Sequence, residues 1–166
     1  AQSSAAEPAN CAALEDGKDY FPDKVSSEHS AFWDITYHDT YKVVTVANSE
    51  DASPDAKLHY LLVQCGAEVP ELTGELEGAL VVQVPIDRAI VTHRNALAML
   101  HEIDATVSIV GVTKNFLGFA ETDDWYANIM NVANQPQGVG SESDLDYERT
   151  LSLEPDVIFM AGYGPG

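Results

Sequence analysis

Histidines are the first residues to consider for chemistry, because clusters of them with acidic side chains hold catalytic metals. None of the five histidines falls in an H-x-H pair or an H-E-x-x-H motif. They are His29, His38, His59, His93 and His101. A helix would also point His101 and its neighbour Glu102 in different directions. The pattern favours surface or hydrogen-bonded histidines and predicts no metal site; a metal-dependent enzyme is kept as a competing hypothesis.

A nucleophilic site would need an activated serine or cysteine. The G-x-S-x-G elbow of serine hydrolases is absent, and residues 138–142 (GVGSE) resemble it only superficially. The same Gly-x-Gly follows no predicted strand and lacks the third glycine of a phosphate-binding loop. The sequence therefore predicts a protein that is not an enzyme, with no catalytic residue and no cofactor.

The few basic residues give a more informative pattern. Arg94 and Lys114 each follow a predicted strand, and Arg94 and Asn95 begin a predicted helix, whose free N–H groups favour anions. Two cations on one rim of an acidic chain would attract an anion. The candidate ligand-binding residues, including two aromatic side chains for contact area, are His93, Arg94, Asn95, Lys114, Phe116 and Tyr163. The alternative is that these are ordinary loop residues.

Strands that alternate with helices would position these candidates. Apolar strands are predicted at residues 88–92, 106–112 and 157–161, and helices at 95–103, from 122 onward and at 146–153. Such alternation is typical of a parallel sheet covered on both faces. Ligands of these sheets bind outside the carboxyl ends of the strands, which here lead into loops at 92–95, 113–117 and 162–166.

Two details of the helices can also be predicted. The helix over 95–103 is expected to bury one face at helical spacing, formed by Ala96, Met99, Leu100 and Ile103. The helix after residue 121 is expected to take Thr122 as its N-cap, with acids in its first turn.

The first half of the chain has a different pattern. Residues 32–84 indicate β-structure, with strands at 41–46, 58–64 and 79–84 and loops at 48–55 and 68–78. The first two strands are expected to form an antiparallel hairpin. The predicted fold class is therefore α/β: a parallel-sheet lobe with flanking helices, preceded by an antiparallel β-hairpin layer. Residues 1–18 are predicted to be a flexible acidic lead-in, and residues 19–166 a single α/β lobe.

Composition limits the partners. The formal net charge is -19, from 27 acidic and 8 basic residues. Nucleic acid and anionic membrane surfaces are therefore disfavoured, because both are bound through Lys and Arg. No apolar stretch approaches the roughly 20 residues of a transmembrane helix, so no membrane insertion is expected.

The sequence contains two cysteines, Cys11 and Cys65. The sequence begins with small and polar residues (AQSSAA). Such a start is typical of a mature protein after removal of its signal peptide; the alternative is an arbitrary boundary. In an exported protein the two cysteines could form a disulfide; the alternative is two free thiols.

The order of segments resembles a known family. Residues 84–91 (VPIDRAIV) and the helix ending at 100–105 (LHEIDA) resemble a P-x-R-hydrophobic strand followed by a helix. The most specific match is 145–158 (LDYERTLSLEPDVI), which is similar to a G…(N/D)-x-E-x-(I/L)-x-x-L-x-P-D-x-(V/I) signature. Residues 19–44 also resemble the amino-terminal extension of a subset of the family. These are ABC-transporter substrate-binding proteins of the iron-siderophore and cobalamin type, which have a helical linker.

The resemblance implies a function and a location. Family members have two α/β lobes that hold a ligand between them, and this sequence resembles the amino-terminal lobe. They capture ferric siderophores, haem or corrinoids outside the cytoplasm, in the periplasm or extracellularly, and deliver them to an ABC permease. A glutamate at the position of Glu148 meets permease arginines in related proteins; otherwise Glu148 is a solvated acid at a helix start.

A ferric siderophore is the expected ligand, because its negative charge suits Arg94 and Lys114. A corrinoid would depend more on Trp125, Phe116 and Tyr163. The alternative from another class is a secreted structural or interaction protein that keeps the lobe without transport.

Overall fold

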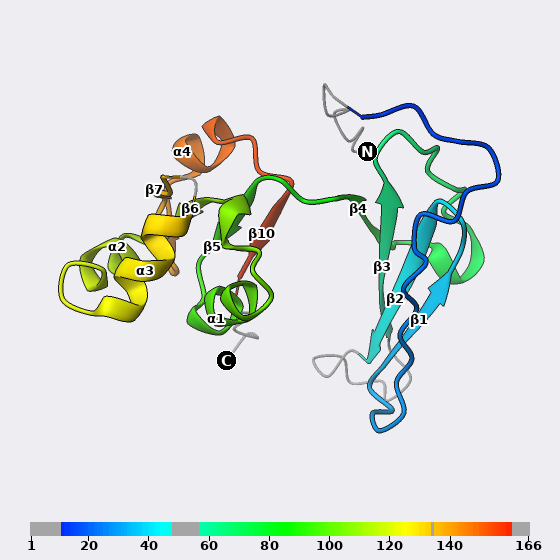
Figure 1. Ribbon diagram of the computed structural model, residues 1–166, viewed down its shortest axis with the longest axis horizontal. Coiled ribbons are helices and arrows are strands. Elements are labelled where there is room, and N and C mark those ends of the chain that lie inside the picture. Colours follow the sequence, from blue (N-terminus) through cyan, green and yellow to red (C-terminus); the bar gives the residue numbers. More distant parts are fainter. Residues whose placement is uncertain (1–10, 48–56, 134, 161–166) are drawn as a thin grey trace. The chain divides into compact units, whose positions relative to one another are not determined.

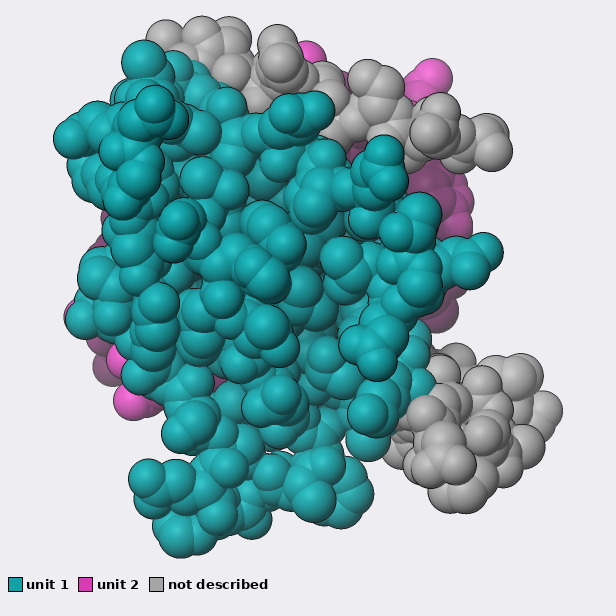
Figure 2. All heavy atoms as spheres, turned by 90° about the vertical axis from the view of Figure 1, so that its right-hand side faces the viewer, with its two compact units in different colours: residues 1–85 teal, residues 86–166 magenta. Residues whose placement is uncertain are grey.

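The computed structural model describes residues 11–47, 57–133 and 135–160. The chain forms two compact units, Ala1–Pro85 and Ile86–Gly166 (Figure 1 and Figure 2), and each is described by itself. The α/β fold class is confirmed: an all-parallel sheet with flanking helices follows a largely antiparallel sheet. Whether residues 19–166 act as a single lobe depends on how the units associate, and this stays a prediction.

Unit 1 is built on a four-stranded sheet in chain order. Its strands are β1 (Trp33–Tyr37), β2 (Tyr41–Ala47), β3 (Lys57–Gln64) and β4 (Leu80–Val84). The predicted hairpin of β2 and β3 is confirmed, since the two strands pair antiparallel. β1 adds to β2 antiparallel, and β4 lies parallel to β3. The loop expected at 48–55 lies outside the described residues.

The core of unit 1 lies on one face of this sheet. Alternate residues of a strand point to the same face, which here buries Val43, Leu61 and Val63. The segment between β3 and β4 covers them, and Leu76, from the short 3₁₀ helix η1 (Gly74–Leu76), packs on this cluster.

A disulfide joins Cys11 to Cys65, just after β3, with their Cα atoms 5.3 Å apart. Residues 11–18 form no helix or strand, and the backbone N–H of Glu15 donates to the Tyr20 hydroxyl at 2.7 Å. Gly66 has φ +87°, and a Cβ there would lie 3.3 Å from the Cys11 Cβ. The crosslink thus fixes the start of the described chain at the end of the sheet.

Polar contacts attach the rest of the amino-terminal segment to the sheet. The backbone N–H of Tyr20 donates to the Asp39 carbonyl at 2.8 Å, and that of Val25 donates to the Tyr37 hydroxyl at 3.0 Å. Lys24 lies 2.8 Å from Asp19, and its hydrogen bond lowers the pKa of that carboxyl.

Unit 2 contains the predicted parallel sheet, with strand order β10-β5-β6-β7 and every pair parallel. Its strands are β5 (Ala89–Val91), β6 (Ile109–Val112), β7 (Gln137–Gly138) and β10 (Val157–Phe159). The remaining elements are α1 (Arg94–Glu102), η2 (Thr106–Ser108), α2 (Lys114–Phe119), α3 (Asp124–Val132), β8 (Gly140–Ser141), β9 (Asp144–Leu145) and α4 (Tyr147–Ser152).

Buried side chains lie on both faces of this sheet. The neighbours Ile90 and Val91 point to opposite faces and belong to different clusters. Val91 packs with residues from α1, α2 and α3, whereas Ile90 packs with Val139 and with Leu153, at the end of α4. Helices therefore cover both faces, as expected of a parallel sheet.

The predicted buried face of α1 is wrong in part. The helix buries Leu97 completely, with Ala96 and Leu100 packed beside it, whereas Met99 and Ile103 are 68% and 70% exposed. Positions two apart on a helix do not share a face, so burial of Leu97 turns Met99 outward.

Several other boundaries differ from the prediction. Residues 106–108 form a 3₁₀ turn, so the strand begins at Ile109. The loop expected at 113–117 is helix α2 from Lys114 onward, and residues 137–138, where no strand was expected, form β7. The N-cap of α3 is Asp123, whose carboxylate accepts from the Trp125 N–H at 2.9 Å, and not Thr122.

Candidate functional site

The carboxyl edge of the unit 2 sheet collects the segments that could bind a ligand. β5 leads through Thr92 and His93 into α1, β6 leads through Thr113 into α2, and β7 leads through Val139 into β8. These strands are neighbours and parallel, so the three connections leave the same edge. Arg94 and Lys114, the first residues of α1 and α2, therefore lie at one edge of the sheet.

The start of α1 is organised by a histidine cap. The His93 Nδ1 accepts from the backbone N–H of Asn95 at 3.4 Å, and His93 is half-buried. Arg94 and Asn95 are exposed and follow in the first turn. Their position at a helix N-terminus, where the dipole favours negative charge, suits an anion.

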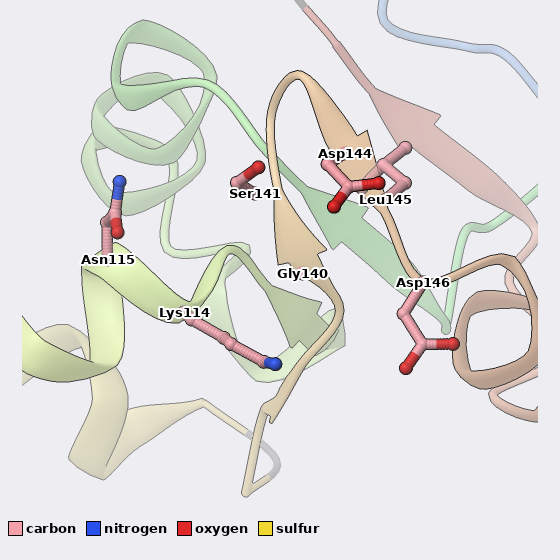
Figure 3. A pocket seen from close by; sticks show the side chains of 7 residues that line it. All are labelled: Lys114, Asn115, Gly140, Ser141, Asp144, Leu145 and Asp146. Atoms are coloured by element: carbon pink, nitrogen blue, oxygen red, sulfur yellow. The ribbon is translucent and has the colours of Figure 1, made fainter.

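A pocket of about 420 Å³ lies beside the start of α2 (Figure 3). Figure 3 shows Lys114 and Asn115 on one side of it, with the β8–β9 hairpin and the start of α4 across from them. The residues that line it are Lys114, Asn115, Gly140, Ser141, Asp144, Leu145 and Asp146. Of the five predicted ligand-binding residues that the structure describes, only Lys114 lines this pocket.

The other predicted residues have different surroundings. His93, Arg94 and Asn95 lie at the start of α1, at the same edge of the sheet. Phe116 is only 6% exposed, and its ring lies 5.7 Å from that of Tyr126. The ring belongs to the core that holds α2 against α3, and its contact with a ligand stays a prediction. Tyr163 lies outside the described residues.

Glycines allow close packing within the β8–β9 hairpin and between β7 and α2. Gly140 has φ +96°, and a Cβ there would lie 2.4 Å from the Asp144 carbonyl oxygen. A Cβ at Gly138 would lie 3.0 Å from the Lys114 Cγ. From the sequence the pocket is missed, because the strands beside it have two residues each and are too short to show a period.

The electrostatics of the pocket are mixed. Lys114 brings one positive charge, and Asp144 and Asp146 bring two negative charges. The Asp146 carboxylate also caps α4 by accepting from the Arg149 N–H at 3.0 Å. Lys114 makes no ion pair within the described residues, so its ammonium is available to a bound molecule. The pocket alone therefore has more negative than positive charge, so an anion bound at this edge of the sheet would need Arg94 as well as Lys114.

Glu148, the expected permease-docking residue, lies exposed in the first turn of α4. Two large side chains on the same helix, Tyr147 and Leu151, are 75% and 73% exposed. Trp125, proposed for corrinoid contact, is half-buried on α3 and packs against Tyr126 with ring centroids 4.8 Å apart.

Two further features bear on the class of protein. Among residues 11–47, 57–133 and 135–160, no three His, Cys, Asp or Glu side chains are grouped so that they could hold a metal ion. No helix in this part of the chain combines the length and the apolar character needed to cross a membrane.

These features define an α/β unit with two basic residues at the carboxyl edge of its parallel sheet. The chain is 30% identical, over 100 residues, to the molybdate-binding protein MolA of Haemophilus influenzae. The matched region is 57% of this chain and 26% of the relative, so the chain spans about a quarter of that protein's length. No family model and no solved structure matches the chain. The similarity is thus to a binding protein, and membership of the siderophore and cobalamin family stays a prediction.

Proposed function

We propose that this chain is part of an extracytoplasmic binding protein that captures a metal-containing anion for an ABC permease. The observation that carries the proposal is the placement of Arg94 and Lys114 after neighbouring parallel strands, at the edge where such sheets bind ligands. Similarity to a molybdate-binding protein supports an oxyanion of a metal as one form of this anion.

Two ligand types share the required chemistry. A metal oxyanion and a ferric siderophore are both negatively charged, and both suit a bidentate Arg94 with Lys114 as a point charge. A corrinoid is less supported, because Phe116 is buried and Trp125 packs in the core. The protein would bind its ligand without making or breaking covalent bonds.

The exposed face of α4 supports docking to a second protein. Glu148 is close on α4 to the exposed Tyr147 and Leu151, and large side chains near a charge are typical of protein interfaces. We therefore propose that this face meets the permease, with Glu148 paired to a basic residue there. Glu148→Arg is expected to abolish ligand-dependent stimulation of the permease ATPase while leaving the affinity for the ligand unchanged.

Isothermal titration calorimetry tests the ligand. The protein would be titrated with sodium molybdate, sodium sulfate, a ferric hydroxamate siderophore and cyanocobalamin. Arg94→Gln and Lys114→Gln are each expected to weaken binding of the preferred anion about tenfold or more, since hydrogen bonds between charged groups contribute about 1.5–3 kcal/mol. Lys18→Gln, which removes the same charge from unit 1, is the matched control.

The outcomes separate the ligand types. If molybdate binds much more tightly than sulfate, the result supports a metal oxyanion as the ligand. If binding heat is observed only with the ferric siderophore, the result supports a metal chelate. Binding of cyanocobalamin alone, or of none of the four, contradicts the proposal. So does an equal effect of Lys18→Gln and Lys114→Gln.

A further inference from the structure

Unit 1 contains a second cavity, of about 500 Å³, that the proposed transport function does not use. It is lined by polar side chains from three strands and from η1: Asp34, Thr36, Thr45, Lys57, His59 and Glu75. A volume of this size is within the range of small-molecule sites.

The cavity lies on the same face of the sheet as the core of unit 1. Along β2 and β3, alternate residues place Thr45 beyond the buried Val43, and His59 beyond the buried Leu61. On β1, Asp34 is the register partner of Thr45. The face is therefore apolar under the segment that contains Leu76 and polar further along the strands, where the cavity opens.

The charges in the cavity are opposite in sign but do not pair with one another. Lys57, Asp34 and Glu75 form no salt bridge with any residue in the described ranges. Asp34 and Lys57 are on β1 and β3, with β2 between them, so their backbones are two strand spacings, about 10 Å, apart. All three side chains are thus available to a bound molecule that carries both charges.

The neutral side chains of the cavity provide hydrogen-bonding groups that would orient a bound molecule. The Thr45 hydroxyl and the His59 Nδ1 are hydrogen-bonded at 3.1 Å, which orients the imidazole. The Nε2 of the same ring has no partner within the described residues, and the Thr36 hydroxyl adds a second neutral donor and acceptor.

From this arrangement we infer that the cavity binds a basic α-amino acid. Its single carboxylate would meet Lys57 and the His59 Nε2, and its two cationic groups would meet Asp34 and Glu75. Apart from the imidazole, the cavity has one positive and two negative side chains, the inverse of the charges of lysine or arginine. Matched charges in a partly enclosed site give specificity as well as affinity.

Calorimetry with L-arginine, L-lysine, L-glutamate and L-alanine as separate probes tests the inference. L-arginine or L-lysine is expected to bind, with an affinity at least about tenfold higher than that for L-alanine, which lacks the second cation. Glu75→Gln and Lys57→Gln are each expected to weaken this binding about tenfold or more.

Glu77→Gln is the matched control, because Glu77 is an exposed acid two residues from Glu75 that does not line the cavity. Circular dichroism of each variant checks that the sheet is intact. Absence of heat with all four amino acids, equal affinity for L-alanine and L-arginine, or equal effects of Glu75→Gln and Glu77→Gln would each overturn the inference. None of these results bears on anion binding by unit 2.

Discussion

The Cys11–Cys65 disulfide is expected to stabilise unit 1 strongly and unit 2 hardly at all. It closes a loop with a sequence separation of 54 residues, all of it within unit 1. The loss of chain entropy on crosslinking a loop of this length corresponds to about 4 kcal/mol of stability at 25 °C. Replacing both cysteines by serine should lower the free energy of unfolding of unit 1 by about that amount.

The two tryptophans allow each unit to be followed separately. Trp33 lies in unit 1 and Trp125 in unit 2, and the sequence has no third tryptophan. Trp125→Phe leaves a fluorescence signal from unit 1 alone, and Trp33→Phe leaves one from unit 2. Urea unfolding would be measured with and without the disulfide in each background.

The urea midpoint reported by Trp33 should fall by more than about 1 M on loss of the disulfide, because m is about 1–3 kcal/mol/M for small domains. The midpoint reported by Trp125 should be unchanged. An unaffected Trp33 midpoint, or an equal fall of the Trp125 midpoint, would refute this expectation. Reduction of the unmodified disulfide with dithiothreitol provides a check that needs no cysteine substitution.

Four further substitutions test unit 2, each by urea unfolding followed through Trp125. Arg88→Met removes the hydrogen bonds from the Arg88 guanidinium to backbone carbonyls at the end of α4, at 2.6 to 3.1 Å. It should lower the free energy of unfolding by about 2 kcal/mol, and an unchanged stability would contradict a role for Arg88 in capping α4. Leu97→Ala should lower the free energy of unfolding by about 2–5 kcal/mol, and Met99→Ala, at an exposed position, by less than about 0.5 kcal/mol. A larger effect of Met99→Ala would instead support the buried face of α1 predicted from the sequence. Gly140→Ala should disrupt the pocket hairpin, because its Cβ would overlap the Asp144 carbonyl; unchanged stability and anion affinity would argue against this geometry.

The sequence predicted the features of the fold that depend on long apolar patterns. Strands β5, β6 and β10 of the parallel sheet, and the hairpin of β2 and β3, are rich in β-branched and aliphatic residues. Such a composition is typical of buried strands. The edge carrying Arg94 and Lys114 followed from strand direction alone.

The features it missed have weak local signals. α2 has six residues, contains Gly118 and lacks a side-chain N-cap, so nothing in its sequence separated it from a loop. Strands β7, β8 and β9 have two residues each, too few to show a period. Helical spacing allowed two faces of α1, and contact with the sheet decided for the one that contains Leu97.

The candidate site was predicted only in part for a related reason. A residue just after a strand can be placed at an edge, but whether its side chain faces solvent or the core depends on the next element. Phe116 was expected at the ligand because α2 was not foreseen, and the helix turns its ring toward Tyr126. The polar cavity of unit 1 depends on strand register, which the sequence does not give.

The position of β10 in the parallel sheet affects the order in which the chain can fold during synthesis. Its partner β5 is the first strand of unit 2, so one side of β5 lacks its neighbour until residues 157–159 have been made. The pairs of the unit 1 sheet, in contrast, join strands consecutive in the chain and are complete at residue 84. On the ribosome, unit 1 can therefore form its sheet while the strand edges of unit 2 still need protection from other chains.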